Sequence, residues 1–478
     1  MRAKTLAVSF AAVLVAGCAL KAPPGKDELR GEALPNLKTP ERWTAGGGSS
    51  SAVAVVNGWL ATFNDRELEA LVKEALEFNP DLRVAAARIE QAAGYAKAAG
   101  AKLYPQVNLL ARGGGKASGD GSGLQGVGIV AGWEVDLWGR IRSGREAATL
   151  QYVSVQLDTE YARQSIAALV AKSWFLATEA RLQKANAESM VAAADQLTGF
   201  ARDRERIGKG DSYDVALAQA SLETYRDAVQ QLDLAYQQAL RALEALAGRY
   251  PAAAAGVAAQ LPAKPDPVPV GMPSELLERR PDVVAAERRV AAAFYRVEEA
   301  KMARLPVISL TASVTSISSD LFVLTSHANP IWSFGAALFA PLFTGGALEA
   351  QVEIRTAEQK QAVAEFGRIG VRAFGEVENA LSSEFTLDER AAILARAVAE
   401  NERALEFANT RYRVGAGDLR AVQERQLALF SARTALTHVR AEQLVQRINL
   451  YLALGGNFER NPSGPPPASA SSDPAGTK

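Results

Sequence analysis

The sequence predicts an α+β fold in which short strands alternate with very long helices and in which one structural unit occurs twice. Proline is absent from Gln106 to Tyr250 and from Leu342 to Asn461, so long helices can form in both stretches. Four short segments alternate between apolar and small or polar residues, which is the period-two pattern of strands. Three motifs also recur in the same order in the two halves of the chain, which indicates a duplication.

The composition excludes several classes of protein. The chain has 478 residues, with Lys+Arg 53 balanced by Asp+Glu 53, and 48% of its residues are hydrophobic. A disordered chain would have fewer apolar residues and a larger net charge, and a nucleic-acid-binding protein would usually show a basic excess. One cysteine and two histidines exclude a disulfide framework and a Cys-rich metal site. We therefore expect no metal and no nucleic-acid partner. Since the chain also contains no HExxH motif and no complete phosphate-binding loop, we expect no enzyme and no cofactor.

The N-terminus has the layout of a secretory signal. Two basic residues precede the apolar stretch Leu6–Val15, which is too short to span a membrane. This stretch ends before Gly17-Cys18 and resembles the bacterial lipoprotein signal, which implies cleavage before Cys18 and acyl chains, such as palmitate, on that cysteine. Ala19 in place of aspartate implies sorting to the outer membrane. The alternative is an incidental cysteine in an ordinary signal peptide.

The repeated motifs define two structural repeats. Asn79-Pro80-Asp81 recurs as Arg280-Pro281-Asp282, and each triplet opens a helical run. The turn at 206–211 recurs at 413–418, and the helix end at 245–248 recurs at 452–455. The predicted segments are a signal peptide at 1–17, a lipidated segment and linker at 18–59, a first repeat at 60–250, a Pro-rich linker at 251–272, a second repeat at 273–458 and a disordered tail at 459–478.

The pattern of each repeat predicts a helix, two strands, a very long helix, a tight turn and another long helix. Arg140–Ile207 and Ala347–Val414 are each about 68 residues long, or about 100 Å at 1.5 Å per residue. Apolar residues at three-four and seven-residue spacings indicate coiled-coil seams in the helices. The predicted strands lie near Val107–Arg112, Val127–Val135, Ile308–Thr315 and Trp332–Leu338.

Strands of this length with one apolar and one polar face suggest a transmembrane β-barrel. Four strands cannot close a barrel, because about eight are needed, so the chain should oligomerise. One alternative is a sheet packed against helices without lipid. A membrane helix within Leu321–Leu348 is disfavoured, because prolines and glycines interrupt it.

Three further segments carry a family resemblance. Trp133-Glu134-Val135-Asp136-Leu137-Trp138-Gly139-Arg140, Leu276-Leu277-Glu278-Arg279-Arg280-Pro281-Asp282 and Pro341-Leu342-Phe343-Thr344-Gly345-Gly346 resemble the signature segments of outer-membrane efflux proteins, TolC-like and in particular OprM/NodT-type lipoproteins. The resemblance covers about Leu60 to Phe458. It implies an α+β membrane channel, a homotrimer with one twelve-stranded barrel in the bacterial outer membrane, and a helical tunnel in the periplasm with an equatorial belt.

The resemblance also implies a function. The chain would be the passive outer-membrane channel of a tripartite efflux system, with a periplasmic membrane fusion adaptor and an inner-membrane RND pump as partners. Two alternatives stay open: a type I secretion duct for polypeptides, and a lipid-anchored structural coiled coil without a pore.

The helix-connecting turns are the main candidate sites. Asp211 and Asp418 are placed to cap the returning helices. The resemblance implies adaptor docking at Ile207, Gly208, Lys209, Gly210, Val414, Gly415, Ala416 and Gly417. It places a periplasmic gate at Asp418, Arg420 and Glu424. Arg420 departs from the hydrophobic residue of the family, and it could close the mouth by ion pairing with glutamate or be solvated.

Aromatic residues near the strand ends are candidates for membrane-interface contacts, because aromatic girdles lie at the headgroup level of barrels. Packing in a protein core is the alternative for each. The residues are Trp133, Trp138, Trp332, Phe334 and Phe339.

Overall fold

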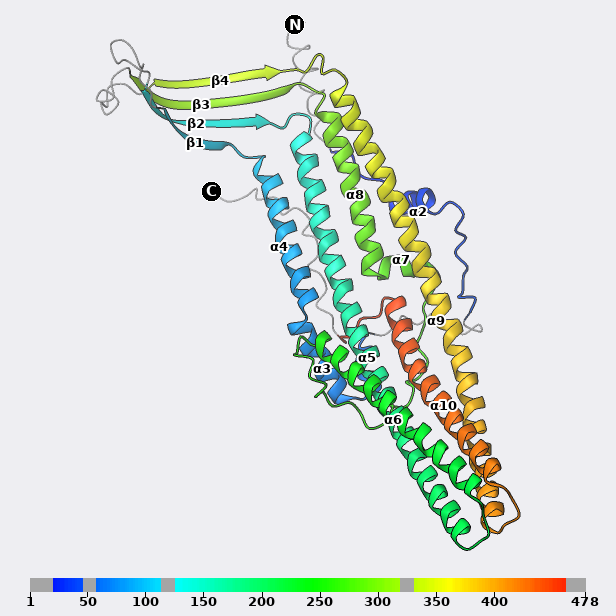
Figure 1. Cartoon of the computed structure of the whole chain (residues 1–478). Coiled ribbons are helices and arrows are strands. Elements are labelled where there is room, and N and C mark those ends of the chain that lie inside the picture. Colours follow the sequence, from blue (N-terminus) through cyan, green and yellow to red (C-terminus); the bar gives the residue numbers. More distant parts are fainter. Residues whose placement is uncertain (1–19, 46–56, 113–124, 319–330, 461–478) are drawn as a thin grey trace. The chain divides into compact units, whose positions relative to one another are not determined.

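The computed structural model describes residues 20–45, 57–112, 125–318 and 331–460 (Figure 1). The predicted signal peptide, Cys18 and the tail from residue 461 lie outside these residues. The described helices are α2 (Lys26–Ala33), α3 (Arg66–Phe78), α4 (Pro80–Ala101), α5 (Arg140–Arg206), α6 (Ser212–Leu246), α7 (Leu276–Arg279), α8 (Pro281–Met302), α9 (Ala347–Arg413) and α10 (Leu419–Ala453), with short 3-10 helices η1 (Trp59–Phe63) and η2 (Pro273–Glu275). The strands are β1 (Gln106–Arg112), β2 (Gln125–Val135), β3 (Val307–Ser318) and β4 (Ile331–Phe339).

The chain forms two compact units, and both repeats contribute to each. The long helices α5 and α9 begin in unit 1 and end in unit 2. Unit 1 takes its described residues from Met1–Leu37, Ala87–Asp158 and Asp282–Ile369, and unit 2 takes them from Lys38–Ala86, Thr159–Pro281 and Gly370–Lys478.

Unit 1 contains one four-stranded antiparallel sheet in the order β1-β2-β3-β4. The strand β1 follows α4 and β3 follows α8, whereas β2 leads into α5 and β4 leads into α9. All four strand–helix junctions therefore lie at the same end of the sheet, as Figure 1 shows. Strands β1 and β4 are the edges, and each has a partner on one side only.

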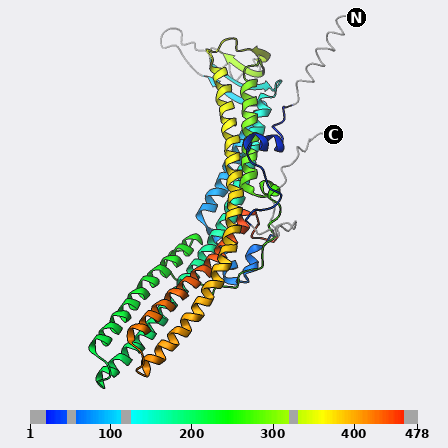
Figure 2. The same cartoon turned by 90° about the vertical axis from the view of Figure 1, so that its right-hand side faces the viewer.

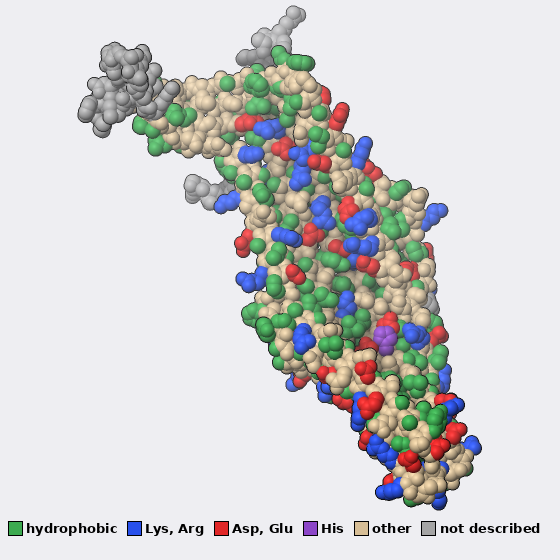
Figure 3. All heavy atoms as spheres, in the orientation of Figure 1, with side chains coloured by type: hydrophobic (Ala, Val, Ile, Leu, Met, Phe, Trp, Pro, Cys, Tyr) green, Lys and Arg blue, Asp and Glu red, His purple; other side chains and the backbone are tan. Residues whose placement is uncertain are grey.

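The register confirms the predicted alternation and extends it across the whole sheet. Pairing places Leu109 opposite Ile129, Ile129 opposite Val314, and Val314 opposite Trp332. Because opposed residues share a face, these side chains form one row of an apolar face that runs across all four strands. Charged side chains are sparse over the sheet on the side shown in Figure 3. The other face is rich in glycine, serine and threonine, including Gly128, Gly132, Ser309, Thr311, Ser313, Thr315, Ser333 and Gly335.

The two longest helices, α5 and α9, each have 67 residues and end one residue before the predicted bounds. In unit 2 the later parts of α5 and α9 run beside α6 and α10 (Figures 1 and 2). Their predicted seams are buried and contain small residues, which allow close helix packing. Among the described helices, none is both long and apolar enough to cross a bilayer. The buried seam residues are Ala187, Met190, Ala194, Leu197, Ala201, Val422, Leu429 and Leu436.

The Pro-rich linker is fixed to unit 2 by buried charged groups. The carboxylate of Glu244, in α6, accepts hydrogen bonds from the backbone N–H groups of Ala253, Ala254 and Ala255 at 2.7, 2.7 and 2.8 Å. Farther along, the guanidinium of Arg447 donates to the carbonyl of Pro265 at 2.9 Å. Arg447 is 1% exposed, so these bonds are shielded from water.

Glu244→Gln should destabilise unit 2. Burial alone would raise the pKa of Glu244, but the backbone N–H groups of the linker outweigh burial and hold this pKa below its ordinary value of 4.5. The carboxylate therefore stabilises the folded state above about pH 4.5, and this contribution is lost as the pH falls through the lowered pKa. We expect Glu244→Gln to cost about 1–3 kcal/mol at pH 7.

The measurement is thermal unfolding in detergent between pH 3 and pH 8. The difference in unfolding temperature between the parent protein and Glu244→Gln should be largest at pH 7 and should decrease toward pH 3. Glu389→Gln, at an exposed position of α9, is the matched control and should be nearly neutral. A difference that grows toward acidic pH would contradict the role of the carboxylate.

Candidate functional site

The two tight turns between the long helices have the same backbone geometry. Gly208 has φ 69° and Gly415 has φ 79°, the left-handed conformation that ends a helix. The amide of Lys209 bonds the carbonyl of Arg204 at 2.9 Å, and the amide of Ala416 bonds the carbonyl of Arg411 at 2.8 Å. Both turns lie in unit 2 and are related by an offset of 207 residues, the difference between 208 and 415.

Aspartates cap both returning helices, as the sequence predicts. The side chain of Asp211 accepts from the amide of Asp214 at 2.9 Å, and that of Asp418 accepts from the amide of Ala421 at 2.7 Å. A carboxylate at this position also interacts favourably with the positive end of the helix dipole. Asp418 is therefore a helix cap in the structure, whatever further role it has.

The residues predicted to dock the adaptor form the surface of both tips. Ile207 is 62% exposed and Val414 is 73% exposed, which is high for branched apolar side chains. Lys209 and Ala416 are exposed beside them. Exposed apolar residues at adjacent turns are typical of a surface that contacts a partner.

A contact between a half-buried arginine and a buried tyrosine joins the two tips. The guanidinium of Arg204, in α5, donates to the carbonyls of Lys209 at 2.9 Å and Tyr412 at 2.8 Å, and it lies 4.8 Å from the centre of the Tyr412 ring. Tyr412 is 2% exposed, and its hydroxyl has no hydrogen-bond partner among the described residues. Burial and the nearby carboxylate of Asp214 raise the pKa of Tyr412. The tips of the two repeats thus form one connected site.

The gate candidate Arg420 bonds a tyrosine. Its guanidinium donates to the hydroxyl of Tyr213 at 3.1 Å, and this bond is the first cause of a raised pKa for Arg420. The nearest cation described for Glu424 is Arg425, at 4.0 Å. In this protomer the structure therefore joins Arg420 to α6, and it does not pair Arg420 directly with Glu424.

Sequence reasoning missed Arg204, Tyr213 and Tyr412. Tyr213 occupies the position in the first repeat that Arg420 occupies in the second, since they are 207 residues apart. A position-by-position comparison of the two repeats at the tips would have shown that an aromatic residue in the first repeat corresponds to a charged residue in the second. The hydrogen bond itself depends on how the two helical hairpins pack, which the repeat does not specify.

The aromatic candidates fall into two groups. The indole N–H of Trp133 donates to the carbonyl of Leu103 at 3.0 Å, and that of Trp138 donates to Pro306 at 2.7 Å. Through these hydrogen bonds, the two residues connect the end of β2 to the neighbouring strand–helix junctions of unit 1. The other three, Trp332, Phe334 and Phe339, are 67, 81 and 68% exposed, so they are not core residues of the protomer.

Comparison with known proteins shows relatives along nearly the whole chain. TtgC of Pseudomonas putida, a probable efflux pump outer membrane protein, is 28% identical, and the match covers 96% of each chain. CusC of Escherichia coli, a cation efflux system protein, is 30% identical over 84% of this chain and 89% of its own. The solved structure of the outer-membrane channel OprN superposes with a TM-score of 0.81 at 27% identity, and covers 89% of this chain and 99% of that one.

The sequence profile of the outer membrane efflux proteins matches residues 71–249 and 272–456. These two matches coincide with the two repeats, and the fold agrees with that of the solved relative OprN. The chain belongs to the outer membrane efflux protein family.

Proposed function

We propose that this chain is the outer-membrane channel subunit of a tripartite efflux system, through which small molecules pass passively from periplasm to exterior. The continuous apolar face of the four-stranded sheet is the observation that carries this proposal. A face of this kind suits lipid, and the opposite face of glycine and hydroxyl side chains suits a water-filled lumen.

The edges of the sheet support assembly into a homotrimer. Strands β1 and β4 each leave one side unpaired, which is costly in a lipid environment where water cannot satisfy backbone groups. Pairing of β4 with β1 of a second copy removes both edges when the ring closes. Three copies give twelve strands, which is within the range of natural outer-membrane barrels.

The tips support contacts with other components of an efflux system. Ile207 and Val414 present apolar groups, and Lys209 adds a cation, at the ends of the helical hairpins. We propose that these residues bind a periplasmic adaptor, which in turn connects the channel to an inner-membrane RND pump. The channel itself performs no reaction, and the pump supplies the energy.

The relatives support efflux of small molecules over polypeptide secretion. The curated relatives are named for toluene efflux, antibiotic efflux, cation efflux and pyoverdine export. These cargoes differ in charge and size, which fits a wide passage whose selectivity lies in the pump. We propose small solutes as the cargo of this chain.

Purified protein reconstituted in planar bilayers should form pores, because three copies enclose a lumen. We expect discrete conductance steps together with a detergent-corrected mass of a trimer. A structural coiled coil would give no steps, and a monomeric mass would contradict closure of the barrel. Restoration of antibiotic resistance in a strain that lacks its own outer-membrane channel, with the cognate pump and adaptor, tests efflux itself.

Arg420→Ala and Tyr213→Phe should each open the periplasmic end of the channel. Both variants remove the same hydrogen bond between α6 and α10, and we expect each to shift the closed–open equilibrium roughly two- to tenfold toward the open form. The measurement is open probability in single-channel recordings. Arg440→Ala, at an exposed position farther along α10, is the control. Equal open probabilities in all the variants and the parent would exclude this gate.

We also propose that Cys18 carries acyl chains that hold the N-terminus at the membrane. Cys18→Ala should abolish incorporation of labelled palmitate, while the protein still reaches the outer-membrane fraction because the sheet remains able to insert. Label that persists in the variant would refute attachment at this residue.

A further inference from the structure

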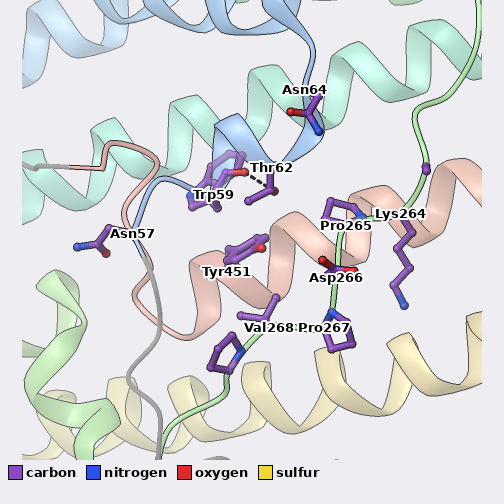
Figure 4. Close-up of a pocket in the computed structure, with 12 residues that line it drawn as sticks. Asn57, Trp59, Thr62, Asn64, Lys264, Pro265, Asp266, Pro267, Val268 and Tyr451 are labelled. Atoms are coloured by element: carbon purple, nitrogen blue, oxygen red, sulfur yellow. Dashed lines mark hydrogen bonds between the residues drawn. The ribbon is translucent and has the colours of Figure 1, made fainter.

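A cavity of about 500 Å³ lies in unit 2 beneath the Pro-rich linker. Figure 4 shows η1 on one side of it, the linker on the other and Tyr451 of α10 between them. Its volume is within the range of about 300–1,000 Å³ that is typical of small-molecule sites. Neither the proposed passage of solutes nor the tips of the helices use this cavity.

The cavity lies at a position where the two repeats differ. Tyr451 lies 207 residues after Glu244, so the two are equivalent positions of the repeats. At Glu244 the linker backbone closes onto the side chain, with three N–H groups within 2.8 Å of the carboxylate oxygens. At Tyr451 the linker residues 263–269 border the cavity, and no linker N–H bonds the Tyr451 side chain among the described hydrogen bonds. The equivalent position therefore binds the linker backbone in one repeat and lines the cavity in the other.

The walls of the cavity are rigid. The rings of Trp59 and Tyr451 stack with centroids 6.0 Å apart and an interplanar angle of 18°. On the opposite wall the prolines fix their own backbone φ angles, and Arg447 holds the carbonyls of Pro265 and Asp266. A ligand would therefore meet a preformed site and would pay little conformational entropy to order it.

Several polar groups that line the cavity have unused hydrogen-bonding capacity. No hydrogen bond is described for the hydroxyl of Tyr451, the carboxylate of Asp266 or the amide of Asn64 within the described parts of the chain. Thr62 donates its hydroxyl proton to the carbonyl of Trp59 at 2.6 Å, shown dashed in Figure 4, and keeps its acceptor capacity. These groups come from η1, its flank, the linker and α10, and they surround one space.

The charge of the cavity disfavours anions. Lys264 is the cation in the lining, and its ammonium is paired with Glu384 at 3.0 Å and Asp388 at 2.7 Å. The carboxylate of Asp266 has no described cation to balance it and is exposed. A bound anion would therefore be repelled by Asp266 without compensation.

We propose that this cavity binds a neutral pyranose sugar. The carboxylate of Asp266 accepts hydrogen bonds from sugar hydroxyl groups, and the hydroxyl of Tyr451 and the amide of Asn64 bond others. The apolar C–H groups of the sugar ring lie against the prolines of the linker, because the rings of Trp59 and Tyr451 stack on each other and are only 2 and 6% exposed. A molecule with many hydroxyl groups and modest apolar patches matches a lining in which amide, hydroxyl and carboxylate groups alternate with prolines.

The test uses the full-length protein in detergent, with chitotriose, maltotriose and trigalacturonic acid as probes. Ligand-observed saturation-transfer NMR and titration calorimetry should show saturable binding of at least one neutral trisaccharide, and roughly tenfold weaker binding of the anionic one. Chitotriose carries the N-acetylated sugars of cell-wall glycans and maltotriose does not, so the pair distinguishes the source of the sugar. Either preference supports the proposal.

Two variants and one control connect binding to the cavity. Asp266→Ala and Tyr451→Phe each remove a bonding group, and each should weaken binding roughly tenfold, the effect of losing about 1.4 kcal/mol. Glu353→Ala, at an exposed position of α9 in unit 1, should leave binding unchanged. Circular dichroism and unfolding temperature show whether the variants are folded.

Three results would overturn the proposal. The first is that neither neutral sugar binds saturably. The second is that folded Asp266→Ala and Tyr451→Phe bind the sugar as tightly as the parent protein does. The third is that the anionic sugar binds more tightly than the neutral ones. The first result would also follow if a second copy of the chain fills the cavity in the trimer. The outcome is independent of pore formation, because the bilayer recordings measure conductance without sugar.

Discussion

Backbone N–H and C=O groups that face lipid must find partners within the protein, and this requirement governs the assembly of the molecule. Helix α5 and the other long helices satisfy their own backbone groups, but the sheet of unit 1 has two open edges. A single copy cannot satisfy them, so the stable membrane form requires other copies. The apolar face from Leu109 to Trp332 then has a lipid environment in which its exposure is favourable.

The same duplicated unit makes different contacts in its two copies. The turns at Gly208 and Gly415 share one backbone geometry, which gives the tip two similar surfaces. Arg420 faces Tyr213, its own counterpart in the first repeat, and so joins the two helical hairpins through positions that were once equivalent. At the other end of these hairpins, Glu244 binds the linker, whereas Tyr451 borders a cavity.

Much of the fold could be predicted from the sequence because its signals are local. Alternation along Val127–Val135 identified β2, and the proline-free stretch together with the Gly-containing turn placed the end of α5 within one residue. The caps at Asp211 and Asp418 follow from the preference of aspartate for this position. The contacts that define the tip site and the cavity join residues about 200 or more positions apart, and they depend on packing between helices. Neither spacing nor composition predicts that Arg204 contacts Tyr412, or that Tyr451 and the linker border one cavity.

In the assembled channel one face of the sheet should meet lipid and the other should meet water. Single cysteines placed in turn along Val127–Val135 of β2, in a Cys18→Ala background, and labelled with a fluorophore in reconstituted vesicles, test it directly. A lipid-soluble quencher should reach labels at Val127, Ile129, Ala131 and Trp133, whereas a water-soluble quencher should reach those at Gly128, Val130 and Gly132. Access of the water-soluble quencher to every position, without alternation, would contradict the transmembrane sheet.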